Sequence, residues 1–137
     1  MDEQKRPEDL TGMETGAAKE YIIQHIAALK ETERQRAAAE AEQAKWASRA
    51  SLARSKGRED LAARAEAEAA GRRALAERLG AEMEALKASI ETMRRQLPAL
   101  AARERAVDAD LLLEKLAQEA GYDSSQDAER ERQFKEL

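Results

Sequence analysis

Cysteine is absent from this 137-residue sequence, and aromatic side chains are nearly so, with one Trp, one Phe and two Tyr. Without cysteine the chain has no disulfide framework and no thiolate chemistry. No run of about 18 apolar residues occurs, so no segment is expected to span a membrane. The opening residues, MDEQKRPEDLTGMETG, lack the apolar region of a secretory signal. We therefore expect a cytoplasmic protein.

Histidine and clustered glycine are also scarce, which argues against catalysis. His25 is the only histidine, so one chain cannot build an imidazole-rich metal site, and we expect His25 to be a half-exposed helix residue. The six glycines are scattered and form no phosphate-binding loop. We expect no enzyme, no metal and no cofactor. The net charge of −4 gives no argument for a nucleic-acid partner.

What the sequence does contain is alanine and charge: 31 alanines, and 38% of all residues charged. This composition, with few glycines and prolines, is typical of long helices or a coiled coil. Acid-first pairs at i,i+4, such as Asp60–Arg64 and Glu91–Arg95, suit exposed helix faces but add only a few tenths of a kcal/mol each. The predicted fold class is all-α.

The stretch SLARSKGREDLAAR, residues 51 to 64, decides between one long helix and two. Gly57 suits the left-handed position just past a helix end. Arg54 and Lys56 precede it, and Glu59 and Asp60 follow it, which is the order that complements both helix dipoles at a turn. The sequence therefore predicts an antiparallel two-helix hairpin with its turn near residues 55–58. Residues equidistant from Gly57 should then be neighbours.

Apolar spacing extends the prediction along both helices. In the first helix the large residues come early, and the stripe is expected to continue through Ala37, Ala41, Ala44 and Ala47 or Ser48, with a stutter near Glu33. In the second helix heptad steps of 4 and 3 run from Leu86 to Leu111. Gly71 and Gly80 are expected to let the helices approach closely, a hinge being the alternative. The residues expected to pack the hairpin are Tyr21, Ile22, Ile26, Leu29, Trp46, Leu86, Ile90 and Met93.

Three regions follow from these patterns. Residues 1–13 are polar and without periodicity, and we expect a disordered head. Residues 14–121 should form the hairpin, whose second helix extends past the first and kinks near Pro98. Residues 122–137 are expected to form a short C-terminal helix or tail.

Two surface features have a functional interpretation beside an ordinary one. The basic tip consists of Lys45, Arg49, Arg54, Lys56, Arg58 and Arg64. Residues 45 to 65 hold these six cations against two carboxylates, a net charge of +4. The tip is either an ordinary solvated helix end or a contact for anionic lipid or an acidic partner.

The second feature is a leucine cluster with no counterpart in the first helix. It consists of Leu111, Leu112, Leu113 and Leu116. These leucines either pack against the C-terminal segment or mediate self-association, because a bare apolar stripe seldom stays solvated.

The segment KWASRASLARSKGREDLAARA resembles the hairpin region of the phage shock protein A family, which includes the plastid vesicle-inducing protein and is related to ESCRT-III. The similar positions are Trp46, Arg49, Arg54 and Gly57 to Arg64. The flanking helices look like those of the family over about residues 14 to 110. The chain resembles a version truncated at both ends, because residues 1–13 do not match the family's amphipathic N-terminal helix and residues 122–137 are shorter than its C-terminal helices.

The resemblance implies a non-enzymatic, homo-oligomeric protein of the bacterial envelope-stress response. It implies a peripheral position on the inner face of the cytoplasmic membrane and contact with an anionic membrane surface. The alternative is an adaptor that binds an AAA+ regulator or a longer family member without touching lipid.

Overall fold

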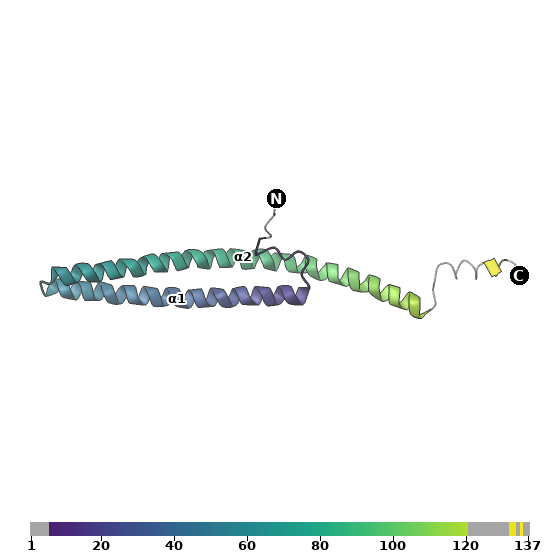
Figure 1. Ribbon diagram of the computed structural model, residues 1–137, viewed down its shortest axis with the longest axis horizontal. Helices are drawn as coiled ribbons and strands as arrows, with labels where there is room; N and C mark the ends of the chain where they lie inside the picture. The colour runs from purple at the N-terminus through teal and green to yellow at the C-terminus, as the bar shows by residue number, and fades with distance from the viewer. Residues whose placement is uncertain (1–5, 121–131, 134, 136–137) are drawn as a thin grey trace.

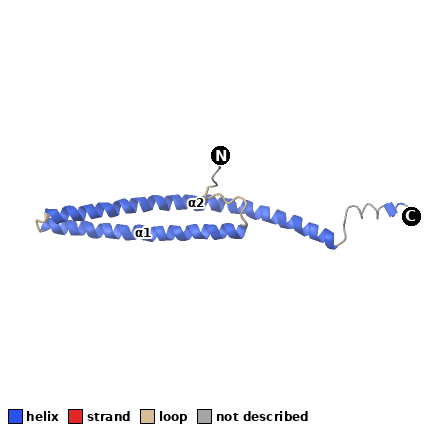
Figure 2. Ribbon diagram, viewed as in Figure 1, coloured by secondary structure: helices blue, strands red, loops and turns tan. Residues whose placement is uncertain are grey.

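The computed structural model describes residues 6–120 together with residues 132, 133 and 135. Helix α1 spans Thr15–Ser55 and helix α2 spans Glu59–Glu119. Figures 1 and 2 show the two helices side by side and antiparallel, with α2 running on past the start of α1. Within residues 6–120 there is no strand. The predicted all-α hairpin is confirmed.

The turn forms where the charges and Gly57 indicated. Gly57 has φ of 72°, the left-handed conformation that glycine adopts without strain. Its N–H donates to the Arg54 carbonyl at 3.0 Å, and the Arg58 N–H donates to the Ala53 carbonyl at 2.8 Å. This pair of hydrogen bonds is a Schellman motif, which satisfies the last carbonyls of α1. Glu59 and Asp60 lie in the first turn of α2.

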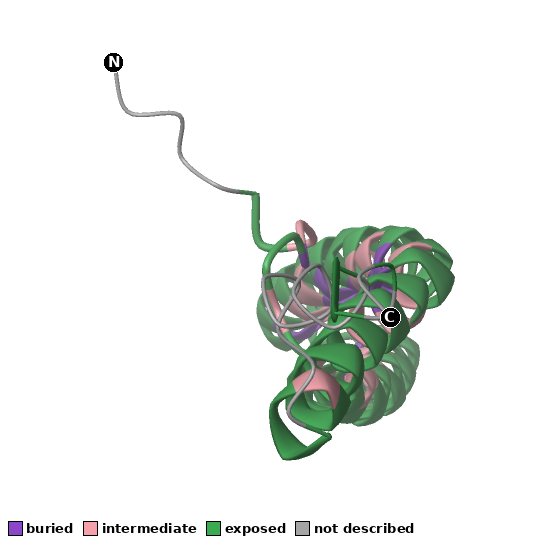
Figure 3. Ribbon diagram, turned by 90° about the vertical axis from the view of Figure 1, so that its right-hand side faces the viewer, coloured by how far each residue is buried: buried purple, intermediate pink, exposed green. Residues whose placement is uncertain are grey.

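Packing between the helices follows a regular heptad in both. Viewed along the long axis, the buried segments face the contact between the helices and the outer surfaces are exposed (Figure 3). The α2 seam is mostly apolar and extends the predicted stripe back to the turn. Its buried or half-buried members are Ala62, Ala65, Ala69, Arg72, Ala76, Leu79, Met83, Leu86, Ile90, Met93, Leu97 and Leu100.

The stripe predicted for the middle of α1 was wrong. Ala37, Ala41, Ala44 and Ala47 are all exposed, as is Ser48. The observed seam has no stutter. The prediction went wrong because polar residues occupy several seam positions, and spacing counted on apolar residues alone skips them. Its buried or half-buried members are Ile22, His25, Leu29, Thr32, Arg36, Ala39, Gln43, Trp46, Ala50 and Ala53.

The large side chains gather at the end of the hairpin far from the turn. Met93 is fully buried there, Ile22 and Ile90 are nearly so, and Tyr21, Ile26 and Leu29 pack against them. Near the middle the core is smaller, with Ala39 and Ala76 against Leu79. The apolar core between the helices is therefore largest at the end of the hairpin where α1 begins.

The expectation of a disordered head was wrong for residues 6–13. Leu10 is fully buried in the large apolar cluster, and Met13 packs against the same cluster. The Leu10 N–H donates to Gln96 Oε1 at 2.8 Å, and Gln96 Nε2 donates to the Glu8 carbonyl at 2.6 Å. The buried Leu10 side chain and the two hydrogen bonds of the Gln96 amide hold this segment in place. A composition averaged over residues 1–13 shows neither contact.

Helix α2 continues without a break through Pro98, which lies alongside the start of α1. It is bowed over its length (Figure 1), and the kink near residue 98 stays a prediction. Pro98 is exposed, so its missing N–H lies on the solvent side of the helix. The predicted C-terminal helix over 122–137 lies outside the described residues, apart from residues 132, 133 and 135, which are helical.

Candidate interaction surfaces

The basic tip is less positive than its own cations suggest. Arg54 pairs with Glu66 at 2.5 Å and with Glu59 at 3.5 Å, and this bonding to Glu66 raises its pKa. Arg58 pairs with Asp60 at 3.5 Å. Widening the window to residues 42–68 adds three carboxylates and no cation, so the net charge falls to +1. The field of the tip is therefore short-ranged.

Three tip cations have no acidic partner among the described residues. Within residues 6–120, Arg49, Lys56 and Arg64 form no ion pair, whereas Lys45 pairs with Glu42 at 3.4 Å. All three are exposed, but the guanidinium of Arg49 lies against the Trp46 ring. Lys56 and Arg64 are therefore the charges most accessible to an anionic surface or ligand.

A shallow groove lies beside the tip, next to Trp46. Its volume is 390 Å³, and its lining residues are Trp46, Arg49, Ala53, Leu61, Arg64, Ala65 and Glu68. The Arg49 guanidinium lies 4.5 Å from the Trp46 ring centroid, a cation–π contact. The indole Nε1 is buried without a hydrogen-bond partner among the described residues. An apolar floor with two arginines at its rim suits an acidic amphipathic helix.

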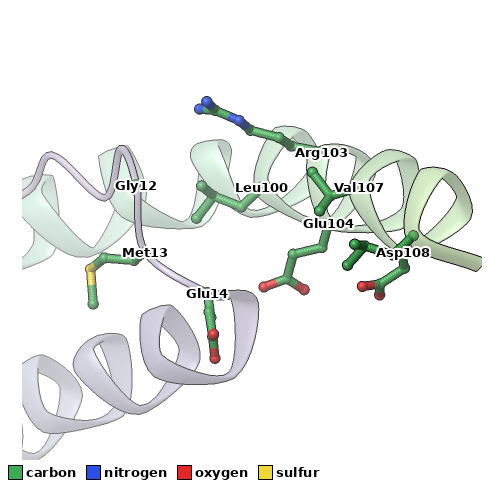
Figure 4. Close-up of a pocket in the computed structure, with 9 residues that line it drawn as sticks. Gly12, Met13, Glu14, Leu100, Arg103, Glu104, Val107 and Asp108 are labelled. Carbon is green, nitrogen blue, oxygen red and sulfur yellow. The ribbon is translucent and has the colours of Figure 1, made fainter. Parts of the chain in front are cut away.

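Where α1 begins, the head and α2 enclose a second, larger groove of 640 Å³ (Figure 4). Met13 and Glu14 lie on one side, and Leu100, Val107 and Leu111 line it from α2. The Glu104 side chain points toward the start of α1, whereas Arg103 points away. No titratable pair or nucleophile with its base is assembled here, so the groove offers shape and apolar surface, not chemistry.

Beyond the start of α1, helix α2 continues without that partner, and its residues 105–119 are called the extension. Its length is about 22 Å at 1.5 Å per residue. All five of its large apolar residues are at least half exposed: Val107, Leu111, Leu112, Leu113 and Leu116, at 50% to 65%. Four carboxylates and two cations leave it a net charge of −2. Leu112, Leu113 and Leu116 of the predicted cluster therefore lie on bare helix, whereas Leu111 faces the groove beside the head.

The remaining predicted site residues are structural in placement. Tyr21, Ile22, Ile26, Leu29, Ile90 and Met93 share one cluster, and Leu86 is half-buried in the seam. Trp46 lies opposite Ala65 and Glu68, as the mirror relation about Gly57 predicts. Sequence reasoning missed Leu10 and Gln96, although an isolated leucine in a polar segment was a signal that could have been used.

The described part of the chain contains no group of three or more His, Asp or Glu side chains placed to hold a metal ion. None of its helices combines the length and apolarity needed to cross a bilayer. No protein-family model matches the chain, and neither does any curated protein or solved structure.

Proposed function

We propose that this chain is a non-enzymatic helical hairpin that self-associates through its extension and acts in maintenance of the bacterial envelope, as the phage shock protein A family does. The observation that supports it most is the extension itself. About 15 residues of helix carry five exposed large apolar side chains. Helix α1 begins beside Glu104 and therefore does not extend alongside them. A bare stripe of this kind on a projecting helix favours association with another helix.

Envelope location is supported by the resemblance of residues 45–65 to the family's tip and by Lys56 and Arg64, two exposed tip cations without an ion pair or a ring contact among the described residues. Each cation near an anionic leaflet contributes up to about 1 kcal/mol. Because the wider tip has a net charge near zero, we expect binding to lipid to be weak for one copy and to become appreciable only when several tips act together.

Light scattering tests self-association. The variant Leu112→Glu/Leu116→Glu places two charges on the extension, while Ile23→Glu/Leu52→Glu is the matched control at two other exposed apolar residues. We expect an oligomeric mass for the wild type and the control and a monomer for the extension variant. An unchanged mass in the extension variant would remove the leucines from the proposal.

Flotation with vesicles containing phosphatidylglycerol tests the lipid contact. We expect binding at low salt that falls as salt screens the charges, and that is reduced about tenfold or more by Lys56→Glu/Arg64→Glu. Lys30→Glu/Arg94→Glu makes the same charge change on exposed faces away from the tip and is the control. Equal loss in both variants would mean that net charge, not the tip, governs binding.

The Trp46 groove favours a second candidate, an adaptor that binds an acidic helix of a protein partner, such as an AAA+ regulator or a longer homologue, without touching lipid. The apolar floor would contact the apolar face of such a helix, and Arg49 and Arg64 would pair with its acidic side chains. Absence of flotation at low salt, together with tryptophan fluorescence that responds to an added acidic amphipathic peptide, would favour this function over the first.

A further inference from the structure

The end of α2 carries a second heptad stripe, separate from the seam with α1. Its residues follow steps of 4, 3, 4, 3 and 4: Ala102, Ala106, Ala109, Leu113, Leu116 and Ala120. Every one of them is exposed. At roughly 100° per residue, this stripe lies on the side of α2 opposite Val107 and Leu111, which continue the seam. Helix α1 therefore cannot cover it, and neither can the head.

The stripe complements itself when two copies run antiparallel. With the two-fold axis level with residue 111, each residue of the stripe faces the partner's stripe residue that is equally far on the other side of 111. Leu113 then lies opposite the partner's Ala109, and Leu116 lies opposite the partner's Ala106. Ala102 meets the partner's Ala120. Both leucines of the stripe therefore face an alanine, which keeps the distance between the two helices uniform and interdigitates large with small side chains.

The flanking residues agree with the same register. On the two edges of the stripe the pairing is centred on residues 112 and 110, because the flanking side chains lie to either side of the core. Arg105 lies beside the partner's Glu119, and symmetry makes this ion pair twice. Leu112 lies beside the partner's Leu112, so the third leucine of the cluster is covered as well. One contact is unfavourable, because Asp110 comes close to the partner's Asp110 near the axis. Two ion pairs and a continuous apolar core outweigh a single repulsion between solvated carboxylates.

We infer that a second copy of this chain covers the stripe, forming an antiparallel two-fold dimer of extensions centred on residue 111. This inference rests on the proposed self-association and specifies its geometry. The hairpin bodies do not collide, because α1 packs on the opposite side of α2. The dimer is a rod with a tip at each end, and at about 52 residues per arm the tips are about 160 Å apart.

A parallel pair fits the same stripe less well. It would stack alanine on alanine near residue 106 and leucine on leucine near residue 113, so the helices would have to splay. It would also lay the two hairpin bodies side by side and bring Arg95 opposite the partner's Arg95. A heterologous contact would leave one stripe uncovered at each end of the assembly.

Disulfide trapping in the full chain distinguishes these arrangements, because the natural sequence has no cysteine. Two single variants, Ala109→Cys and Leu113→Cys, are mixed and oxidised. The antiparallel dimer gives the mixed disulfide between residues 109 and 113 and neither the 109–109 nor the 113–113 disulfide. A parallel dimer gives the 109–109 and 113–113 disulfides. Both sites are exposed, so neither substitution disturbs the hairpin.

A charge swap provides the second measurement. Arg105→Glu should weaken the dimer, and the double variant Arg105→Glu/Glu119→Arg should restore it, by light scattering over a dilution series. An oligomer that gives same-residue disulfides, or that the swap does not restore, overturns the antiparallel geometry and leaves self-association standing. A wild-type chain that is monomeric at every concentration overturns both.

Discussion

Glu104 of α2 accepts a hydrogen bond from the backbone N–H of Thr15, the first residue of α1. The two residues are 89 positions apart in the sequence. Helix α1 has no side-chain cap of its own at this end, so α2 supplies the carboxylate that its positive N-terminus requires. The contact also places the first residue of α1 beside Glu104 of α2, and the extension starts at the next residue of α2.

This hydrogen bond predicts a pH-dependent contribution to stability. The Thr15 N–H, and to a smaller extent the charge of Lys19, lowers the pKa of Glu104. Glu104 therefore stabilises the folded chain above the pKa of an unfolded glutamate, about 4.3, and this contribution is lost as the pH falls through the lowered pKa. We expect Glu104→Gln to lower the melting temperature at pH 7, with the difference from wild type shrinking below pH 4.

Glu20→Gln, on the exposed face of α1, is the control for Glu104→Gln. Thermal unfolding followed by circular dichroism from pH 3 to pH 7 measures both. A melting-temperature difference for Glu104→Gln that stays constant over this range would show that charge at residue 104 plays no part.

Gly57→Ala tests the turn. The Schellman motif needs a left-handed residue at position 57, and a side chain in that conformation costs about 1 kcal/mol. We expect a loss of about that size in the free energy of unfolding by urea, with the hairpin otherwise intact. Gly57→Asn should recover part of the loss, because asparagine tolerates the left-handed region better than alanine. Equal stability of all three would mean that the turn is not held in this conformation.

The turn, the fold class and the α2 seam could be predicted because each has a local signal: a glycine between charges of opposite sign, or leucines at heptad spacing. The α1 seam could not. Arg36 and Gln43 occupy seam positions, and apolar spacing alone shifts the stripe onto exposed alanines. Arg36 fits because its guanidinium lies over Gly80 and its Nη1 is 4.0 Å from the Met83 sulfur. Such a fit depends on a residue 44 positions away.

The candidate surfaces divide in the same way. The leucine cluster could be predicted from the sequence, because pairing about Gly57 leaves no residue of the first helix to cover it. The charge of the tip was overestimated, since Glu66 lies 12 residues from Arg54 and reaches it only across the folded hairpin. The role of Leu10 depends on Gln96, and no local pattern links these two residues.

Two glycines inside α2 should respond differently to alanine. A Cβ at Gly71 meets nothing within 4 Å, so Gly71→Ala gains helix propensity without a clash, and we expect stabilisation of about 1 kcal/mol. A Cβ at Gly80 would lie 3.3 Å from the Arg36 guanidinium, so Arg36 must shift and part of the gain is lost. Urea unfolding should rank Gly71→Ala above Gly80→Ala. The reverse order would contradict the placement of Arg36 over Gly80.

Leu10→Ala tests whether the head is part of the folded structure. Leu10 is fully buried among Ile22, Ile90 and Met93, and removing such a side chain typically costs 2 to 5 kcal/mol. The segment is short, so we expect the loss to appear as detachment of residues 6–13, with α1 and α2 still paired. Hydrogen exchange at the Leu10 and Met13 amides should then accelerate by about thirtyfold or more, equivalent to about 2 kcal/mol. Leu52→Ala removes an equally large but exposed side chain and should leave exchange in the head unchanged. Fast exchange of the same amides already in the wild type would contradict the packed head.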